Sequence, residues 1–521
     1  MFLLFIEYKM NENAALFFVD RNVNGSLKDK TAFIEYGNSS NSISYYDLYD
    51  QSSRLKNLFL KYNISREDRV IILMNDVVQY PVIFWGCLKS GVIPVLLNTL
   101  LSNEIINEII NDSRAKAVFI TSNLLDTFND LLTKNSNIQN IFEIGENSNY
   151  VNFIDEIKKC QIESTIDCSK DEVAFWLYSS GSTGQPKGVK HVHGSLQNTY
   201  DTYGKQVLKI NENDIVFSVA KLFFAYGLGN SMTFPMSVGA TAILLPERPT
   251  PEVVSKLLNE FNVTTFFAVP TIFSAILDFT TSNNFDGFKN LKISVSAGEA
   301  LPENIGKKWY ELTSTHILDG IGSTEMLHIF LSNKIDDLEY GTTGIAVPGY
   351  ELKLLDENNN IIENDEIGEL LVKGESSADG YWNMRNKSRK TFEGEWTRTG
   401  DKYIRNKNGK YVYCGRTDDM FKVSGIWVSP FEVEQAILNH DEVLESAVVP
   451  ETDHEGLVKS KAFIILKTDQ NQKEKLKEIE KAIKEIVKEK IGLWKYPRSI
   501  EFVKTLPKTA TGKIQRFKLR K

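Results

Sequence analysis

The sequence has little cysteine, and this limits how the fold can be held together. Its 521 residues include four cysteines, Cys87, Cys160, Cys168 and Cys414, whose spacing forms neither a Cys-x-x-Cys pair nor a Cys/His metal motif. We therefore expect no disulfide scaffold and no cysteine-bound metal. The default location for such a chain is the reducing cytoplasm.

An overall excess of positive charge is also missing. Sixty Lys and Arg against 68 Asp and Glu give a formal net charge of −8 at pH 7, which argues against nucleic-acid or anionic-membrane binding driven by bulk charge. The balance is uneven, because residues 471–521 carry thirteen Lys and three Arg against six Glu. We interpret this end as a basic module, part of whose charge belongs to a solvated helix face.

A hydrophobic run suited to a membrane is not present either. The longest uncharged stretch, 222–246, contains three glycines, Asn230 and Pro235, and we expect a core helix followed by a strand there. The first ten residues, MFLLFIEYKM, lack the basic start and small-residue cleavage site of a secretory leader. We interpret them as an extended start, with Met10 as an alternative initiator to Met1.

Repeats and sustained heptads are also missing, and the chain instead alternates apolar strands with helical patterns over its first four hundred residues. This alternation predicts an α/β fold with parallel sheets wrapped in helices. After Gly344 short strands with turn signals predict an antiparallel, β-barrel-like part, and from about residue 419 the pattern is that of a small α+β domain. Strands are expected at 69–74, 93–97, 115–121, 241–245, 264–270 and 293–298, and helices at 80–92, 103–112, 251–262 and 473–490.

The first motif is a loop of glycine and hydroxyl residues between an apolar strand and a helical pattern. Residues 178–188 read YSSGSTGQPKG, whose N–H groups and hydroxyls can converge on a phosphate while Lys187 adds a point charge. The spacing differs from the Walker form GxxxxGK[ST], and an ordinary Gly/Ser-rich turn is the structural alternative. The candidate phosphate ligands are Ser179, Ser180, Gly181, Ser182, Thr183, Gly184 and Lys187.

A second motif, DGIGSTE, occupies residues 319–325. Glu325 stands where a dinucleotide fingerprint GxGxxG would have its last glycine, so that interpretation is weak. The Glu325 carboxylate suits Mg²⁺, and the hydroxyls of Ser323 and Thr324 suit a phosphate. A capped helix start is the alternative.

Two further segments complete the set. Asp401 ends the glycine turn WTRTGD and is suited to accept two ribose hydroxyls, while Arg416, fifteen residues on, can reach the same nucleotide. Residues 507–516, PKTATGKIQR, form a glycine-kinked basic loop that contains Lys513. Taken alone, these segments would be interpreted as surface turns and a solvated tail.

Together and in this order, the four segments resemble the adenylate-forming superfamily of acyl-CoA synthetases, adenylation domains and luciferases over nearly the whole chain. Three segments are similar to the benzoate–CoA ligase branch in particular: NAALFFVDR at 13–21, KLFFAYGLG at 221–229 and DGIGSTEMLHIFLSN at 319–333. The resemblance implies an acid–thiol ligase that uses ATP, Mg²⁺ and coenzyme A. A carboxylate would attack the α-phosphorus of ATP, and the thiol would then displace AMP.

The resemblance also implies roles for individual residues. The 179–187 loop would hold the β and γ phosphates, Thr324 the α-phosphate and Glu325 the Mg²⁺, with Asp319 and Gly320 in the same nucleotide site. Asp401 and Arg416 would bind the ribose. Lys513 would stabilise the transition state of adenylation.

Further implied features concern the domains and the acid. Asp418 would be the hinge between domains 1–417 and 418–521, the second of them mobile, and its rotation would bring up Gly425 and Trp427 for the pantetheine arm. The acid would be a small aryl carboxylate in a flat apolar slot. That slot would be lined by Ala225, Tyr226, Gly298, Ile321 and His328.

Alternatives stay open at this point. The acceptor could be the phosphopantetheine of a carrier protein, as in a stand-alone aryl-acid adenylation enzyme, or the chain could be a non-catalytic nucleotide- or partner-binding protein. A dinucleotide oxidoreductase is the weakest option. Core packing explains Tyr226 and His328 about as well as an acid pocket does, and the sequence decides neither the ring substituents nor whether the chain forms a homodimer.

Overall fold

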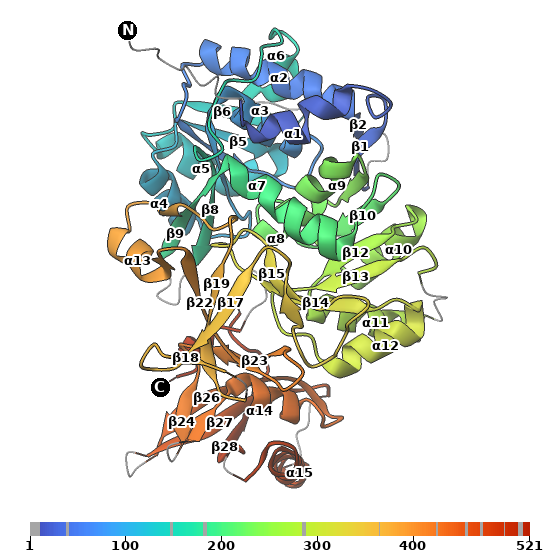
Figure 1. The fold of residues 1–521 in the computed structure, drawn as a ribbon, viewed down its shortest axis with the longest axis vertical. Helices are drawn as coiled ribbons and strands as arrows, with labels where there is room; N and C mark the ends of the chain where they lie inside the picture. The colour runs from blue at the N-terminus through green and yellow to red at the C-terminus, as the bar shows by residue number, and fades with distance from the viewer. Residues whose placement is uncertain are drawn as a thin grey trace, which may run out of the picture. The chain divides into compact units, whose positions relative to one another are not determined.

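The protein is described here by a computed structural model, and its chain forms two compact units (Figure 1). One unit comprises Met1–Glu351 and Val372–Thr397, and the other comprises Leu352–Leu371 and Arg398–Lys521. The structure describes residues 11–37, 41–145, 150–180, 185–283, 288–363, 365–423, 426–453, 457–468, 473–493, 495–508 and 514–520, without the side chains of Ser180 and Lys473.

The first sheet of the first unit is mainly parallel, as the apolar strands predicted. Its order is β20-β9-β8-β4-β3-β5-β6-β7, and the pairs from β8 through β4, β3, β5 and β6 to β7 are parallel. Near-continuous apolar runs are typical of strands covered on both faces. The strands are β3 Arg69–Leu73, β4 Ile93–Leu96, β5 Ala117–Thr121, β6 Asn140–Ile144, β7 Val151–Asn152, β8 Val173–Ser180, β9 Pro186–Val192 and β20 Gly380–Tyr381.

The second sheet runs β16-β15-β14-β13-β12-β10-β11-β1-β2 and is parallel from β14 to β1. Parallel register places the carboxyl ends of its strands along one edge, which is where ligands sit in open α/β sheets. The strands are β1 Thr31–Glu35, β2 Ser42–Ser44, β10 Ile215–Ser218, β11 Thr241–Leu244, β12 Thr265–Ala268, β13 Ile293–Ser296, β14 Ile317–Gly322, β15 Ile329–Ser332 and β16 Ile345–Ala346.

Helices cover these sheets, and α3 illustrates why. Every residue of α3 from Tyr80 to Ser90 is buried, as expected for a helix that is apolar on all sides. Gly86 lets it approach α2 closely, because a Cβ there would lie 2.6 Å from Leu55 Cδ2. The helices are α1 Ala14–Phe18, α2 Tyr45–Lys61, α3 Gln79–Ser90, α4 Asn103–Ser113, α5 Leu125–Lys134, α6 Phe153–Ile157, α7 His193–Thr199, α8 Ala225–Leu228, α9 Phe234–Val238, α10 Pro251–Glu260, α11 Pro270–Ser282, α12 Glu303–Thr313 and α13 Arg385–Thr391.

The uncharged run 222–246 is a core helix and a strand, as predicted. Helices α8 and α9 are joined by a π-helical turn, Gly229–Thr233, and β11 follows. None of the helices in the described part of the chain has the length and apolarity needed to cross a bilayer.

The second unit begins with a sheet in the order β18-β17-β19-β22, with β23 also paired to β22; the β17–β18 and β22–β23 pairs are antiparallel. Short antiparallel strands were predicted here. The strands are β17 Glu351–Leu355, β18 Ile361–Ile362, β19 Gly368–Lys373, β22 Trp396–Arg405 and β23 Tyr411–Arg416. Strand β21 Phe392–Glu393, which lies in the first unit, pairs with Trp396 and Thr397 at the start of β22.

The rest of the second unit is α+β. The apolar face predicted for its long helix is its core face, because Ile479, Ile483 and Val487 are buried together with Val433 and Ile464. The elements are β24 Phe421–Val423, β25 Ile426–Val428, α14 Pro430–Ile437, β26 Val443–Thr452, β27 Val458–Leu466, α15 Lys473–Ile491 and β28 Ser499–Phe502.

The division into units differs from the expected boundary at 417. Residues 352–371 and 398–417 group with the C-terminal residues. The physical reason is that β17, β18 and β19 share one sheet with β22 and β23. The Ser429 hydroxyl, just before α14, also donates to the Cys414 carbonyl of β23. A hinge at Asp418 stays a prediction.

Candidate functional site

The phosphate loop candidate lies in a β-hairpin. Strands β8 and β9 are antiparallel, with Ser179 opposite Lys187 and Ser180 opposite Pro186. The loop was expected to lead into a helix, but β9 comes first and α7 begins at His193. The reason is that residues 189–192 complete an antiparallel ladder with β8. Gly181, Ser182, Thr183 and Gly184 lie outside the described residues.

Lys187, Glu325 and Tyr381 form a polar cluster in the first unit. Lys187 Nζ lies 3.4 Å from Glu325 Oε1, and the Tyr381 hydroxyl donates to the same oxygen at 2.8 Å. Lys187 Nζ also lies 4.8 Å from the centre of the Tyr381 ring. Burial alone would raise the pKa of Glu325, but Lys187 and the Tyr381 hydrogen bond outweigh it and lower the pKa. The carboxylate is therefore an anion at neutral pH.

The segment that carries Thr324 and Glu325 is fixed through its backbone. Ala378 N–H donates to the Glu325 carbonyl at 2.8 Å. His191 Nε2 lies 2.9 Å from the Thr324 carbonyl, which can only accept, so this nitrogen holds the proton. Burial lowers the pKa of His191 to about 4, and the ring is neutral. His191 on β9 thus connects the strand after the phosphate loop to the Thr324 backbone.

Asp319 lies in the middle of β14, at the point where the neighbouring strand β13 ends. It is buried, burial raises its pKa well above the ordinary range, and its Oδ1 has no hydrogen-bond partner among the described residues. Ser296 is its register partner on β13. Gly298 and Ile321 each follow that pair by two residues, so both lie at the carboxyl edge of the sheet. Gly320, between Asp319 and Ile321, leaves room for Ile329, which a Cβ would meet at 3.0 Å.

The candidate acid pocket is an aromatic cluster around His328. The Tyr226 ring, which follows Ala225 at the start of α8, lies 5.7 Å from the His328 ring, and the Tyr226 hydroxyl donates to the Val295 carbonyl at 3.2 Å. Phe234 packs edge-on against His328 at 4.6 Å. The structure therefore brings Tyr226 and His328 together, as the resemblance implied for the two rings.

A buried amide orients the His328 ring. Asn230, in the π-helical turn, has its Oδ1 3.0 Å from His328 Nε2, so Nε2 is the protonated nitrogen. Burial lowers the pKa of His328 to about 3, and its Nδ1 has no partner in the described part of the chain. Gly229 is needed for this approach, since a Cβ there would lie 2.4 Å from His328 Cδ2.

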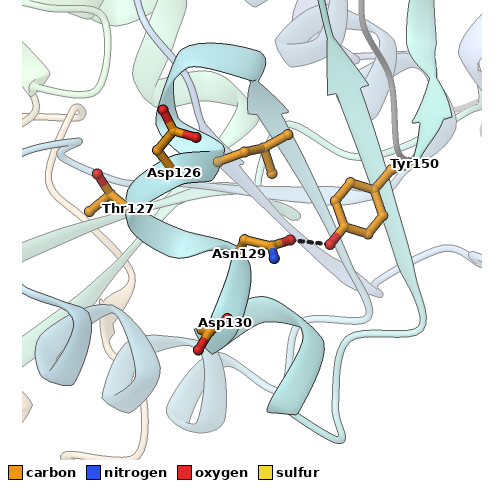
Figure 2. A pocket seen from close by; sticks show the side chains of 6 residues that line it. Asp126, Thr127, Asn129, Asp130 and Tyr150 are labelled. Carbon is orange, nitrogen blue, oxygen red and sulfur yellow. Dashed lines mark hydrogen bonds between the residues drawn. The ribbon is translucent and has the colours of Figure 1, made fainter.

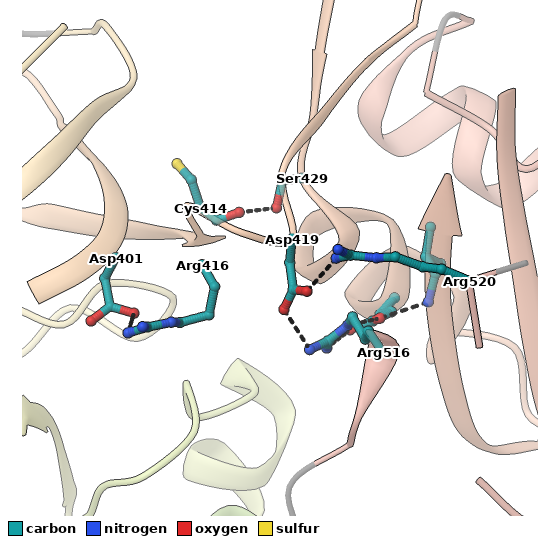
Figure 3. A network of polar contacts seen from close by, with 9 residues as sticks. Asp401, Cys414, Arg416, Asp419, Ser429, Arg516 and Arg520 are labelled. Carbon is teal, nitrogen blue, oxygen red and sulfur yellow. Dashed lines mark hydrogen bonds and ion pairs between the residues drawn. The ribbon is translucent and has the colours of Figure 1, made fainter. Parts of the chain in front are cut away.

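The ribose candidates lie in the second unit. Asp401 on β22 and Arg416 on β23 are register partners, and Arg416 Nη1 lies 3.0 Å from Asp401 Oδ1 (Figure 3). The same nitrogen donates to the Thr399 carbonyl at 3.0 Å. Asp401 is the largest cause of the raised pKa of Arg416. Gly400, at φ +71°, gives the guanidinium room, since a Cβ there would lie 2.8 Å from Arg416 Nη2.

The remaining candidates of the second unit are the predicted hinge and residues that follow it in the sequence. Asp418 is exposed in the turn after β23, and Trp427 on β25 is the register partner of Lys422, whose Nζ lies 4.6 Å from the Trp427 ring centre. Gly425 and Lys513 lie outside the described residues, as do Met1 and Met10.

Sequence reasoning missed Tyr381, His191 and Asn230. Tyr381 lies in a two-residue strand whose register with β9 has no local sequence signal. The motif VKHVHG contains His191, and its alternating pattern marks a buried position, but nothing in it indicates the Thr324 contact.

One surface hollow of about 310 Å³ is lined by α5 side chains and Tyr150, whose hydroxyl donates to Asn129 (Figure 2). It contains none of the predicted site residues. Across the described ranges, no group of three or more His, Cys, Asp or Glu residues could hold a metal ion.

Comparison with known families identifies both parts of the chain. Residues 19–382 match the AMP-binding enzyme family, and residues 432–513 match the C-terminal domain of AMP-binding enzymes. The chain belongs to the AMP-binding enzyme family. The predicted resemblance to adenylate-forming enzymes is thereby confirmed.

Similar members of this family fall in the predicted branch. The chain is 45% identical to a 4-hydroxybenzoate–CoA/benzoate–CoA ligase of Rhodopseudomonas palustris over 98% of its length and 94% of the relative's. A benzoate–CoA ligase from Burkholderia xenovorans is 44% identical, with a TM-score of 0.88 over 98% of this chain and 100% of the other. The anthranilate–CoA ligase AuaEII, solved with anthranoyl-AMP, is 36% identical, with a TM-score of 0.91 over 98% and 96%.

Proposed function

We propose that the protein is an ATP-dependent, AMP-forming aryl-carboxylate–CoA ligase that acts on benzoate-like acids. One observation carries this proposal: Glu325 is held as an anion between Lys187 and Tyr381, in a chain that is similar over almost its whole length to benzoate–CoA ligases. The aromatic cluster around His328 supports the choice of an aryl acid.

In the first half-reaction, an oxygen of the acid's carboxylate attacks the α-phosphorus of ATP, and the bond to pyrophosphate breaks. Lys187 and the 179–184 loop bind the β and γ phosphates, and Thr324 binds the α-phosphate. Asp401 accepts hydrogen bonds from the ribose hydroxyls with Arg416 holding its carboxylate. Lys513 stabilises the charge that develops between the two anionic reactants.

Mg²⁺ fits the Glu325 site. This ion is usually bound by one or two carboxylates together with substrate phosphates and water, and Glu325 supplies an ionised carboxylate fixed by two partners. When bound with ATP, the ion neutralises phosphate charge. Glu325 orients it, and Tyr381 and Lys187 hold Glu325.

In the second half-reaction, the sulfur of the CoA thiolate attacks the carbonyl carbon of the acyl-adenylate, and AMP leaves. The proposed hinge at Asp418 exchanges Lys513 for the segment 422–427, where Gly425 and Trp427 contact the pantetheine arm. We place the enzyme in the cytoplasm, and its four free, buried cysteines suit a reducing compartment.

The test is AMP formation by the purified protein with ATP, Mg²⁺ and CoA. The panel of acids contains benzoate, hydroxy-, amino- and fluorobenzoates, a cyclohexane acid and short fatty acids. We expect CoA-dependent turnover with the benzoate-like acids, and none in a Lys513→Ala control. Pyrophosphate–ATP exchange with aryl acids but no CoA-dependent turnover would instead assign a carrier protein as the acceptor.

A further inference from the structure

A partly buried ion-pair network lies at the C-terminal end of the chain, within the second unit. Arg516 begins a short 3-10 helix, Arg516–Lys518, and its fork meets Glu434 of α14 through two contacts, Nε to Oε1 at 3.0 Å and Nη2 to Oε2 at 2.7 Å. Its third nitrogen, Nη1, lies 3.4 Å from Asp419 Oδ2. Figure 3 shows Arg516 pointing toward Asp419, with Arg520 reaching the other oxygen of the same carboxylate.

Glu434 is the buried centre of this network. Its side chain is 6% exposed, and its Oε1 also accepts from the Val448 N–H at 2.8 Å, which connects α14 to β26. Burial raises the pKa of Glu434 and Arg516 opposes this, since a buried carboxylate stays charged only beside a cation. Breaking one partner of such a pair is strongly destabilising to the local arrangement, whereas a solvated pair has little effect.

Backbone contacts close the basic loop, and the network holds its C-terminal end at Arg516. Lys508 and Ile514 form an antiparallel bridge, and the Gln515 N–H donates to the Pro507 carbonyl at 2.8 Å. Lys513 directly precedes Ile514, and Arg516 lies three residues after Lys513. Asp419, at the other end of the network, directly follows the proposed hinge residue Asp418. The ion pair between Asp419 and Arg516 therefore joins the residue after the hinge to a residue three positions after the lysine.

We propose that Arg516 is a positioning residue for Lys513: it fixes the segment directly after Lys513, residues 514–520, to Glu434 and Asp419, so that this segment moves as one body with the chain after residue 418. The inference rests on the proposed function. Its consequence is selective: the adenylation step depends on the Arg516–Glu434 pair, whereas the thioester step does not, because Lys513 acts in adenylation.

The test separates the two half-reactions in Arg516→Gln, Arg516→Lys and Glu434→Gln. Adenylation is measured by pyrophosphate–ATP exchange with benzoate, and thioester formation by mixing enzyme with preformed benzoyl-adenylate and CoA. We expect Arg516→Gln and Glu434→Gln to lose exchange by roughly 10²-fold, the effect of misplacing a catalytic group by about 1 Å. Thioester formation stays at the wild-type rate. Arg516→Lys, which keeps the charge but not the fork, falls between wild type and Arg516→Gln.

Glu432→Gln is the matched control. Glu432 is two residues away on the same helix, and it pairs with Lys495 at 2.6 Å instead of with Arg516. We expect this variant to keep both half-reactions. Melting temperatures are recorded for all variants.

Two outcomes would overturn the inference. In one, both half-reactions fall together in Arg516→Lys, as a merely structural role requires; in the other, exchange is unchanged in Arg516→Gln and Glu434→Gln. Failure of the proposed function is seen separately, since wild-type protein would then form no benzoyl thioester from benzoate, ATP and CoA.

Discussion

Glu325 shows how much of a metal site depends on neighbours that bind no metal. Its carboxylate is ionised because Lys187 and the Tyr381 hydroxyl both face Oε1. Glu325 and Lys187 were identified from sequence, because each lies in a short motif whose residue types suit Mg²⁺ or phosphate binding. Tyr381 was not identified, because the contact is made by pairing β20 with β9 and not by any local pattern.

Removing the Tyr381 hydroxyl should weaken the use of Mg²⁺. A hydrogen bond to a charged group contributes about 1.5 to 3 kcal/mol, so Tyr381→Phe should require roughly 10- to 100-fold more Mg²⁺ for half-maximal adenylation. The measurement is a Mg²⁺ titration of pyrophosphate exchange. Tyr45→Phe is the control, because this variant also removes a tyrosine hydroxyl and its buried hydrogen bond to the Ala240 carbonyl, and Tyr45 is far from Tyr381 in the sequence. An equal Mg²⁺ requirement in wild type and Tyr381→Phe would contradict the assignment.

His191 should make the protein sensitive to acid. Its pKa is about 4 in the folded protein, below the ordinary 6.5, so the unfolded chain binds the proton first as pH falls. The stability contributed by the neutral ring is complete above pH 6.5 and is lost between pH 6.5 and 4. Phe175 stacks on the His191 ring, and the Glu325 carboxylate is a charged group that partly opposes the lowering of the His191 pKa.

The measurement is the melting temperature of wild type and His191→Gln from pH 7 to 4.5. Glutamine keeps a donor for the Thr324 carbonyl but has no proton to gain. We expect the wild type to lose more stability than the variant as pH falls, and parallel curves would refute this. His191→Leu, which has no donor, should in addition raise the KM for ATP.

At the scale of elements, each of the six strands and four helices predicted by residue range is present near its predicted bounds. Val, Ile and Phe runs such as 69–73 and 117–121 are buried on both faces, so composition alone marks them as strands. The segment after Gly188 was harder. Its short alternating pattern suits a strand only because β8 is available to pair with it, which local sequence does not reveal.

Helix α2 should depend on its capping box. The Ser44 side chain accepts from the Asp47 N–H, and the Asp47 carboxylate accepts from the Ser44 N–H. Ser44→Ala should lower the free energy of unfolding by about 1 kcal/mol. Denaturant unfolding checks this, with Ser42→Ala as the control, an exposed residue of β2. Equal losses in the two variants would contradict a capping role.

At the scale of the whole molecule, the predicted hinge at Asp418 should affect the half-reaction that does not depend on Arg516. Proline at Asp418 would fix the backbone angle φ about which the chain must rotate. We expect Asp418→Pro to keep pyrophosphate exchange and to abolish thioester formation from benzoyl-adenylate, the reverse of Arg516→Gln. Asp419→Pro is unsuitable as a control because Asp419 belongs to the ion-pair network. Equal loss of both half-reactions would refute the hinge.

The division of the chain into two units also predicts which C-terminal gene fragments can be exchanged between relatives. The chain enters the second unit at Leu352, leaves it after Leu371 and returns at Arg398. A gene fragment that starts at residue 398 therefore encodes β23 and all but the first two residues of β22, without the strands β17 and β19 of the same sheet. Exchange of C-terminal units between relatives should succeed when the inserted piece begins near 352, or when both sides of the sheet already match in sequence.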